Sequence, residues 1–167
     1  MKNLFTLAFI LLLSSCGPEI GITEPNDSAY SPVLMDRAVL EASIKVGGPQ
    51  ALKETGKVYA FGNYLFVSEL HQGIHVINNS DPANPVKEHY ITIPGAVDMA
   101  VKGTKLYADN AVDLLTFDIS DIANIQLVDR KRDVFPDMVP PDLINVPSVY
   151  SKENRPANTI IINWIKP

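Results

Sequence analysis

The chain has 167 residues, a formal net charge of −5 and a single cysteine. This length predicts one domain, or one domain with a tail, rather than two full domains. The mild negative charge argues against a nucleic-acid partner because phosphate binding needs a basic face, and one cysteine cannot form an internal disulfide.

The first 15 residues have the pattern of an export signal. An apolar run over residues 4–13 follows Lys2, and it is too short to span a bilayer as a helix but has the length of a signal-peptide core. It leads into Leu13-Ser14-Ser15-Cys16, which resembles the lipobox of bacterial lipoproteins. The resemblance implies a signal peptide over residues 1–15 and lipid attachment at Cys16, with acyl chains that hold the protein on a membrane. The alternatives are an ordinary cleaved signal with a chance cysteine, or a short membrane anchor.

Residues 16–31 carry Gly, Pro, Asn, Asp and Ser with little apolar content and predict a flexible tether. Residues 32–56 form a separate N-terminal segment with a strand-like entry. Asp36 can cap the start of a short helix, and Val39 and Leu40 belong to its apolar stripe.

Residues 57–134 contain one pattern written twice, over 57–94 and 96–134. The first copy has a turn at Gly62 and an Asp-Pro turn at Asp81, and the second has their equivalents at Gly103 and Asp121. The spacings are 41 and 40 positions, since the second copy has one residue fewer in its middle loop. A period of this size indicates a repeated supersecondary unit.

Each copy predicts four antiparallel strands in a meander, because β-branched and aromatic runs alternate with Gly, Asn, Asp and Pro turns. Four strands in about 40 residues are typical of a β-propeller blade. The run Leu114-Leu115-Thr116-Phe117 offers large side chains to both faces of its sheet, as expected for a blade packed between neighbours. The sequence therefore predicts an all-β fold with two four-stranded propeller-like blades.

The blade count predicts an incomplete propeller, because closed propellers have about four to eight blades. The Pro-rich tail over residues 135–167 ends in a β-rich run at residues 158–165. This run could add to a sheet edge, cover a blade face or begin a third blade.

The repeats resemble those of the LVIVD-repeat family of predicted envelope β-propellers. The likeness is carried by Gly73-Ile74-His75-Val76-Ile77 and the turn Asp81-Pro82-Ala83-Asn84-Pro85, with a second copy at Leu115-Thr116-Phe117-Asp118. Asn78 replaces the usual Asp and Ile122 replaces the turn proline. The resemblance implies a propeller-like fold and an envelope location, and it brings no catalytic residues.

Three groups of side chains could carry chemistry, and each has a structural explanation. His71 and His75 are four apart, but their loop-to-strand setting does not place them on one helical face. A series of acids could suggest calcium, although turn formation explains most of its members: Asp98, Asp109, Asp113, Asp118, Asp121 and Asp129. Several aromatic residues could line a glycan surface, although at strand spacing they favour the core: Tyr59, Tyr64, Phe66, Tyr107 and Phe117. The basic run at residues 130–132 predicts a solvated strand end.

These patterns favour a lipid-anchored envelope protein that acts as a non-enzymatic binding or scaffolding module, and the outer membrane is its favoured location. No cofactor or metal is expected, and its partner would be a protein, a glycan or a second copy of the chain. Two alternatives are an envelope hydrolase with a site at the inter-blade loops, where His71, His75 and acids would share a cleft, and a truncated propeller with little independent function.

Overall fold

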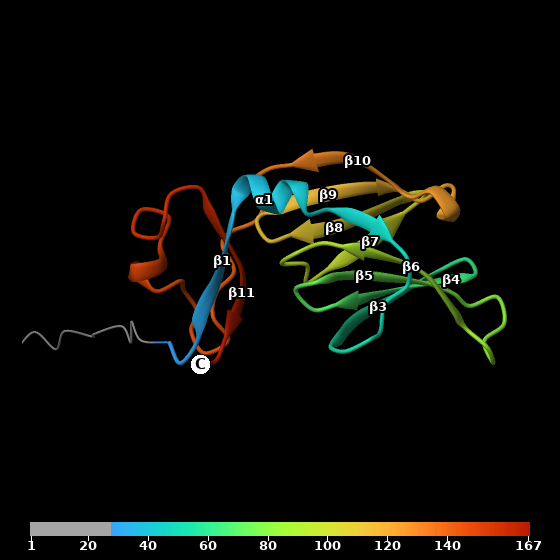
Figure 1. Cartoon of the computed structure of the whole chain (residues 1–167), viewed down its shortest axis with the longest axis horizontal. Helices are drawn as coiled ribbons and strands as arrows, with labels where there is room; N and C mark the ends of the chain where they lie inside the picture. The colour runs from blue at the N-terminus through green and yellow to red at the C-terminus, as the bar shows by residue number, and fades with distance from the viewer. Residues whose placement is uncertain (1–27) are drawn as a thin grey trace, which may run out of the picture.

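The computed structural model describes residues 28–167 (Figure 1). The predicted signal peptide, Cys16 and most of the predicted tether lie outside these residues. The described chain begins with Ser28 and Ala29, whose hydroxyl and backbone N–H donate to the Asp142 carboxylate at 2.7 Å each. The last residues of the predicted tether are therefore held against the C-terminal segment. No described helix is long and apolar enough to cross a bilayer.

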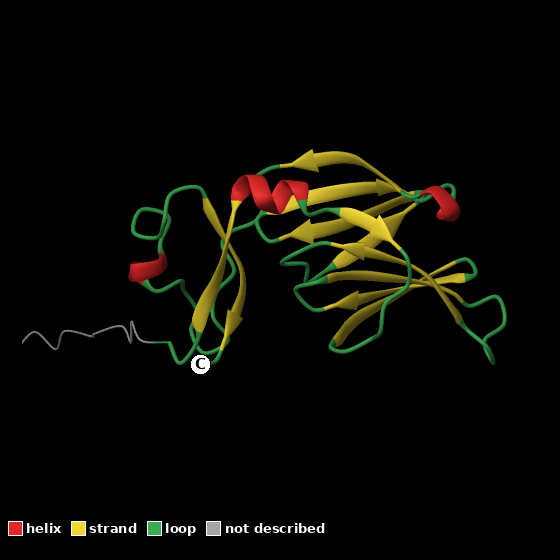
Figure 2. Cartoon of the chain, in the orientation of Figure 1, coloured by secondary structure: helices red, strands yellow, loops and turns green. Residues whose placement is uncertain are grey.

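The predicted all-β fold with two antiparallel blades is confirmed, and Figure 2 shows how little helix accompanies it. The first blade contains β3 (Thr55–Phe61), β4 (Tyr64–Glu69), β5 (Gly73–Asn78) and β6 (Val86–Thr92). The second contains β7 (Met99–Lys102), β8 (Lys105–Asn110), β9 (Asp113–Asp118) and β10 (Gln126–Lys131). Within each blade, strands that follow one another in sequence pair as neighbours, so both blades are meanders.

The two blades repeat their turn chemistry as well as their strands. Gly62 and Gly103 open the first hairpin of each blade with φ values of 56° and 58°, a conformation that favours glycine. Asp81 and Asp121 each accept a hydrogen bond from the backbone N–H two residues later, at 3.0 and 3.1 Å. Such contacts join residues close in sequence, so the turns do not depend on long-range packing.

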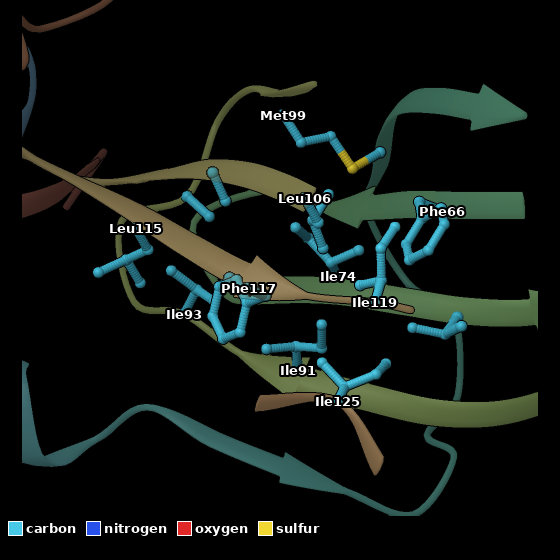
Figure 3. Close-up of a cluster of buried hydrophobic side chains, with 13 residues drawn as sticks. Phe66, Ile74, Ile91, Ile93, Met99, Leu106, Leu115, Phe117, Ile119 and Ile125 are labelled. Carbon is cyan, nitrogen blue, oxygen red and sulfur yellow. The ribbon is translucent and has the colours of Figure 1, made fainter. Parts of the chain in front are cut away.

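A shared hydrophobic core lies between the blades (Figure 3). The first blade contributes Phe66, Ile74, Val76 and Ile91, and the second contributes Leu106, Ala108, Leu115 and Phe117. All eight are at most 1% exposed. Since each large apolar side chain stabilises by roughly 1.5–3 kcal/mol when fully buried, this interface is the main hydrophobic support of the fold.

The blades stack in line, front to back. Leu106 and Phe117, which pack into the shared core, are the repeat equivalents of Leu65 and Ile77. Neighbouring residues of a strand alternate between faces, so Leu65 and Ile77 lie on the face of the first blade that points away from the second. The same comparison relates core residue Phe66 to Tyr107, which lies on the far face of the second blade. Successive propeller blades stack in this way, and each end of such a stack has one outer face.

The N-terminal segment begins with β1 (Ser31–Asp36), α1 (Arg37–Ala42) and β2 (Lys45–Gly47). Asp36 caps α1 by accepting from the N–H groups of Ala38 and Val39, as predicted. β2 pairs with β6 and makes the first blade five-stranded instead of four-stranded. Since β2 and β3 lie at opposite edges of this sheet, residues 48–54 cross its outer face; we call them the strap.

The C-terminal strand β11 (Thr159–Ile165) pairs antiparallel with β1 in a separate two-stranded sheet, seen beside the blades in Figure 1. It therefore joins neither blade sheet. This sheet and α1 share a second, small core that contains Leu40, Ala111, Val112, Ile160 and Ile162. Ala111 and Val112 form the β8–β9 loop, so the terminal segments pack on one end of the second blade. Two short 3₁₀ helices, η1 (Ile122–Asn124) and η2 (Ser148–Tyr150), complete the described chain.

Candidate functional site

An open concavity with a volume of about 570 Å³ lies on the outer face of the second blade. Strands β7, β8 and β9 form its floor, and residues 135–139 form one wall; we call it the blade-2 groove. Its lining is mostly apolar and consists of Val97, Asp98, Met99, Ala100, Tyr107, Ala108, Asp109, Ala111, Leu114, Phe135, Pro136, Asp137, Met138 and Val139.

The alternation of β8 and β9 builds the floor. Leu115 and Phe117 of β9 point into the shared core. Leu114 directly precedes Leu115 on the same strand, so it points to the opposite, outer face and lines the groove. Tyr107 lies on the same outer face because it pairs with Thr116, two residues along the strand from Leu114. The large residues that the sequence placed on both faces of this blade therefore serve two sites, a closed core and an open groove.

The wall of the groove is fixed by three contacts. The Phe135 N–H donates to the Val112 carbonyl at 2.9 Å. Arg155, which is 6% exposed, donates to the Asp137 carboxylate at 3.0 Å. The Trp164 indole N–H donates to the Met138 carbonyl at 2.9 Å. The β8–β9 loop, the loop before β11 and β11 itself thus each fix one position of the wall.

The charged groups that line the groove are all carboxylates. Asp109 accepts from the N–H groups of Val97 and Asp98 at 2.9 and 2.8 Å. Burial raises the pKa of Asp109, although these hydrogen bonds oppose the shift. At the rim, the hydrogen bond from Lys57 at 2.7 Å lowers the pKa of Asp98.

A buried charge cluster lies around Asp113, whose side chain is inaccessible to solvent. Both of its oxygens accept from Arg37, at 2.7 and 2.8 Å, and one also accepts from Arg130 at 2.6 Å. Burial alone would raise the pKa of Asp113, but these bonds and the Asp133 N–H lower it. The cluster joins α1 to one end of the second blade, where β9 begins and β10 ends, which makes it structural. The prediction of a solvated basic run was wrong for Arg130, because this arginine neutralises a buried acid.

The two histidines do not share a cleft with the predicted acids. His75 is fully buried on the outer face of the first blade, where its Nε2 lies 3.0 Å from Glu69 and its ring packs against Tyr90 at 4.7 Å. His71 occupies the β4–β5 loop with a φ of 59°, and burial lowers its pKa. Neither lines the blade-2 groove. Within residues 28–167, no three His, Cys, Asp or Glu side chains are arranged to hold a metal ion.

Glu69 fastens the strap to the first blade. Its carboxylate accepts from the N–H groups of Lys53 and Glu54 and contacts His75. Burial would raise the pKa of Glu69, but these three contacts together lower it. Burial also raises the pKa of nearby Tyr90 to about 12, with a further contribution from the Glu69 charge.

Most of the aromatic residues belong to the core, as predicted, but the blade-2 groove was not predicted. Phe66 and Phe117 are in the shared core, and Tyr59 and Tyr64 pack against it. Tyr107 is the exception, because it lines the groove. Large residues at both parities of β8 and β9 were the available signal for a second apolar face; the wall at residues 135–139 had no signal beyond its prolines.

The fold and groove define a stack of propeller-like repeats with an open apolar face at one end. The LVIVD repeat family matches residues 54–92, which cover strands β3 to β6 of the first blade. No curated protein and no solved structure matched the chain. An LVIVD repeat suggests a repeat-type module for binding or scaffolding.

Proposed function

We propose that this protein is a non-enzymatic binding module that is lipid-anchored in a bacterial envelope and receives an apolar ligand in the blade-2 groove. The observation that carries the proposal is the groove itself. Its volume of about 570 Å³ lies within the range of roughly 300–1,000 Å³ typical of small-molecule sites, which are likewise mostly apolar with a few polar groups.

The repeat equivalence supports a binding role for this face. Tyr107 and Leu114 stand where Phe66 and Ile74 stand in the first blade, and there the same positions are covered by the second blade. The face of the second blade thus has the chemistry of an interface. Residues 135–139 cover it only in part and leave room for another molecule.

The polar groups of the groove support binding rather than catalysis. Asp98 is paired with Lys57, and Asp137 with Arg155. Asp109 is held by backbone N–H groups, and the neighbouring carboxylate of Asp98 is itself engaged by Lys57. A carboxylate with these partners can orient a ligand, whereas catalysis would need a second group in a complementary protonation state.

The proposed location in the cell envelope rests on the N-terminal sequence. The signal-like run before Cys16 supports export, and the lipobox-like residues support an acylated cysteine. The outer membrane is the favoured location. The acyl chains would be its contact with the membrane, and the groove would be its contact with a ligand.

The proposal is tested with an uncharged apolar dye, N-phenyl-1-naphthylamine, and the purified full-length chain. Dye fluorescence should rise on binding, and Ala100→Trp should remove the increase because Ala100 lines the groove. Ala60→Trp is the matched control, since Ala60 is an exposed alanine of the first blade. Equal dye binding by wild type and Ala100→Trp would contradict the groove as the binding site.

A further inference from the structure

The blade-2 groove has an uneven distribution of charge. Three of its lining residues are acidic, namely Asp98, Asp109 and Asp137, and none of its lining residues is Lys, Arg or His. The three carboxylates are not equivalent, because two of them have cationic partners from outside the groove. Lys57 lies 2.7 Å from Asp98, and Arg155 lies 3.0 Å from Asp137.

Of the three groove carboxylates, Asp109 is the one that has no cationic partner among the described residues. The N–H groups of Val97 and Asp98 hold it in place, and one oxygen accepts both of the shorter bonds. The other oxygen has a single contact, to the Val97 N–H at 3.1 Å. Asp109 is therefore positioned by the backbone and retains acceptor capacity toward the groove that it lines.

Aromatic and aliphatic side chains line the same groove as this carboxylate. Tyr107 is two residues before Asp109 on β8 and shares its face of the strand. Phe135 belongs to the opposing wall, and Leu114 to the floor. Aromatic rings attract a cation to their faces, so the same surface that holds an apolar body also favours a positive group.

We propose that the blade-2 groove binds a small molecule in which an ammonium group is attached to an apolar body. The ammonium group pairs with Asp109, and the apolar body contacts Tyr107, Leu114 and Phe135. Charge complementarity selects this class, because the groove lining contains three carboxylates and no Lys, Arg or His, so that an ammonium group meets only opposite charge. A ligand carboxylate would add a further negative charge to the same region.

The test compares three probes with nearly the same body: 2-phenylethylamine, 2-phenylethanol and 3-phenylpropanoate. Binding to the full-length chain is measured by ligand-observed NMR at neutral pH and low salt. We expect the amine to bind about tenfold more tightly than the alcohol, which corresponds to one charge-assisted hydrogen bond. The carboxylate should bind most weakly, and added salt should reduce the preference for the amine.

Two variants assign the preference to Asp109. Asp109→Asn should bind the amine and the alcohol equally, because the amide keeps an acceptor for the backbone N–H groups but removes the charge. Asp121→Asn is the control, since it removes one negative charge at the η1 turn, away from the groove lining. If Asp109→Asn does not fold, the amine-to-alcohol ratio and its salt dependence in wild type still decide the matter.

Because the ligand class rests on the proposed function of the groove, the outcomes separate the two. Equal binding of amine and alcohol by wild type, or a preference that survives in Asp109→Asn, overturns the ammonium assignment and leaves an apolar site. Failure of all three probes while the uncharged dye still binds also overturns the assignment alone. Failure of every probe and of the dye overturns the binding function itself.

Discussion

The outer faces of the two blades are covered to different extents, although the blades share one repeat. On the first blade, the strap crosses the sheet, and Val67, His75, Ile77 and Tyr90 are all at most 7% exposed. On the second blade, residues 135–139 stand off the sheet and leave the blade-2 groove. The repeat therefore specifies the blade, and the segment that follows or precedes it decides whether the outer face becomes core or binding site.

The largest expected effect on stability comes from comparing two positions of β9, one in the shared core and one in the groove. Phe117→Ala should lower the free energy of unfolding by about 3–5 kcal/mol, because it opens a cavity between the blades. Leu114→Ala, three residues earlier on the outer face, should cost about 1 kcal/mol or less since this side chain is only partly buried. Urea unfolding of both variants measures the difference. Equal losses would show that the groove is part of the core.

The charge cluster around Asp113 should give the next largest effect. Asp113→Asn should destabilise the protein by about 3 kcal/mol at neutral pH, because Arg37 and Arg130 lose a buried partner.

The same cluster predicts an acid dependence. The folded pKa of Asp113 lies below its ordinary value of 3.8, so its stabilisation is complete above that value and is lost as the pH falls through the folded pKa. Urea unfolding between pH 7 and pH 2 should show a shallower acid loss for Asp113→Asn than for wild type. Identical slopes would mean that other acids control the dependence.

Loosening the strap tests the contrast between the outer faces directly. Glu69→Gln should cost about 2 kcal/mol, because the N–H groups of Lys53 and Glu54 and the buried His75 ring lose a charged acceptor. Hydrogen exchange at these two amides should accelerate, while exchange in the second blade should not change. Slow exchange at residues 53 and 54 in the variant would show that packing, rather than Glu69, holds the strap.

Light scattering on the same variant tests whether the uncovered face is an interface. Its residues are repeat equivalents of those that pack against the first blade, so a released strap should let a second copy bind head to tail. Glu69→Gln combined with Leu114→Lys is the control, because it blocks the complementary groove. A monomeric Glu69→Gln with fast strap exchange would contradict this expectation.

The smallest effect on stability is expected at Cys16, which belongs to neither blade. Cys16→Ala should leave the urea midpoint unchanged and move the protein from the membrane fraction of a bacterial host to the aqueous fraction, since lipid attachment would be lost. Mass spectrometry of the N-terminal peptide provides a second readout. Membrane retention of the variant without acylation would favour the alternative of a short apolar anchor.

Sequence reasoning was most successful where structure is local. The turns at Gly62, Asp81 and Asp121 are fixed by residues within a few positions, so their chemistry could be read directly. The alternating strands between them followed from the same logic, and the two blades and their short middle loops were correct.

The features that sequence could not supply depend on distant partners. The pairing of β11 with β1 joins residues more than a hundred positions apart, and several destinations were equally compatible with its composition. Arg130 resembled a solvated charge until the structure placed Asp113 beside it. The groove needed the same kind of information, because its floor and wall come from separate segments.

The front-to-back stacking of the blades gives the molecule a direction of growth. Each contact joins two different faces, so a copy of residues 96–134 inserted after Lys131 would present the correct face to Tyr107 and Leu114 and a fresh outer face beyond. Blade number could then change without redesign of any existing contact between blades. The groove would then lie on the last blade of the longer stack. The number of blades and the residues of the ligand site could therefore vary independently in evolution.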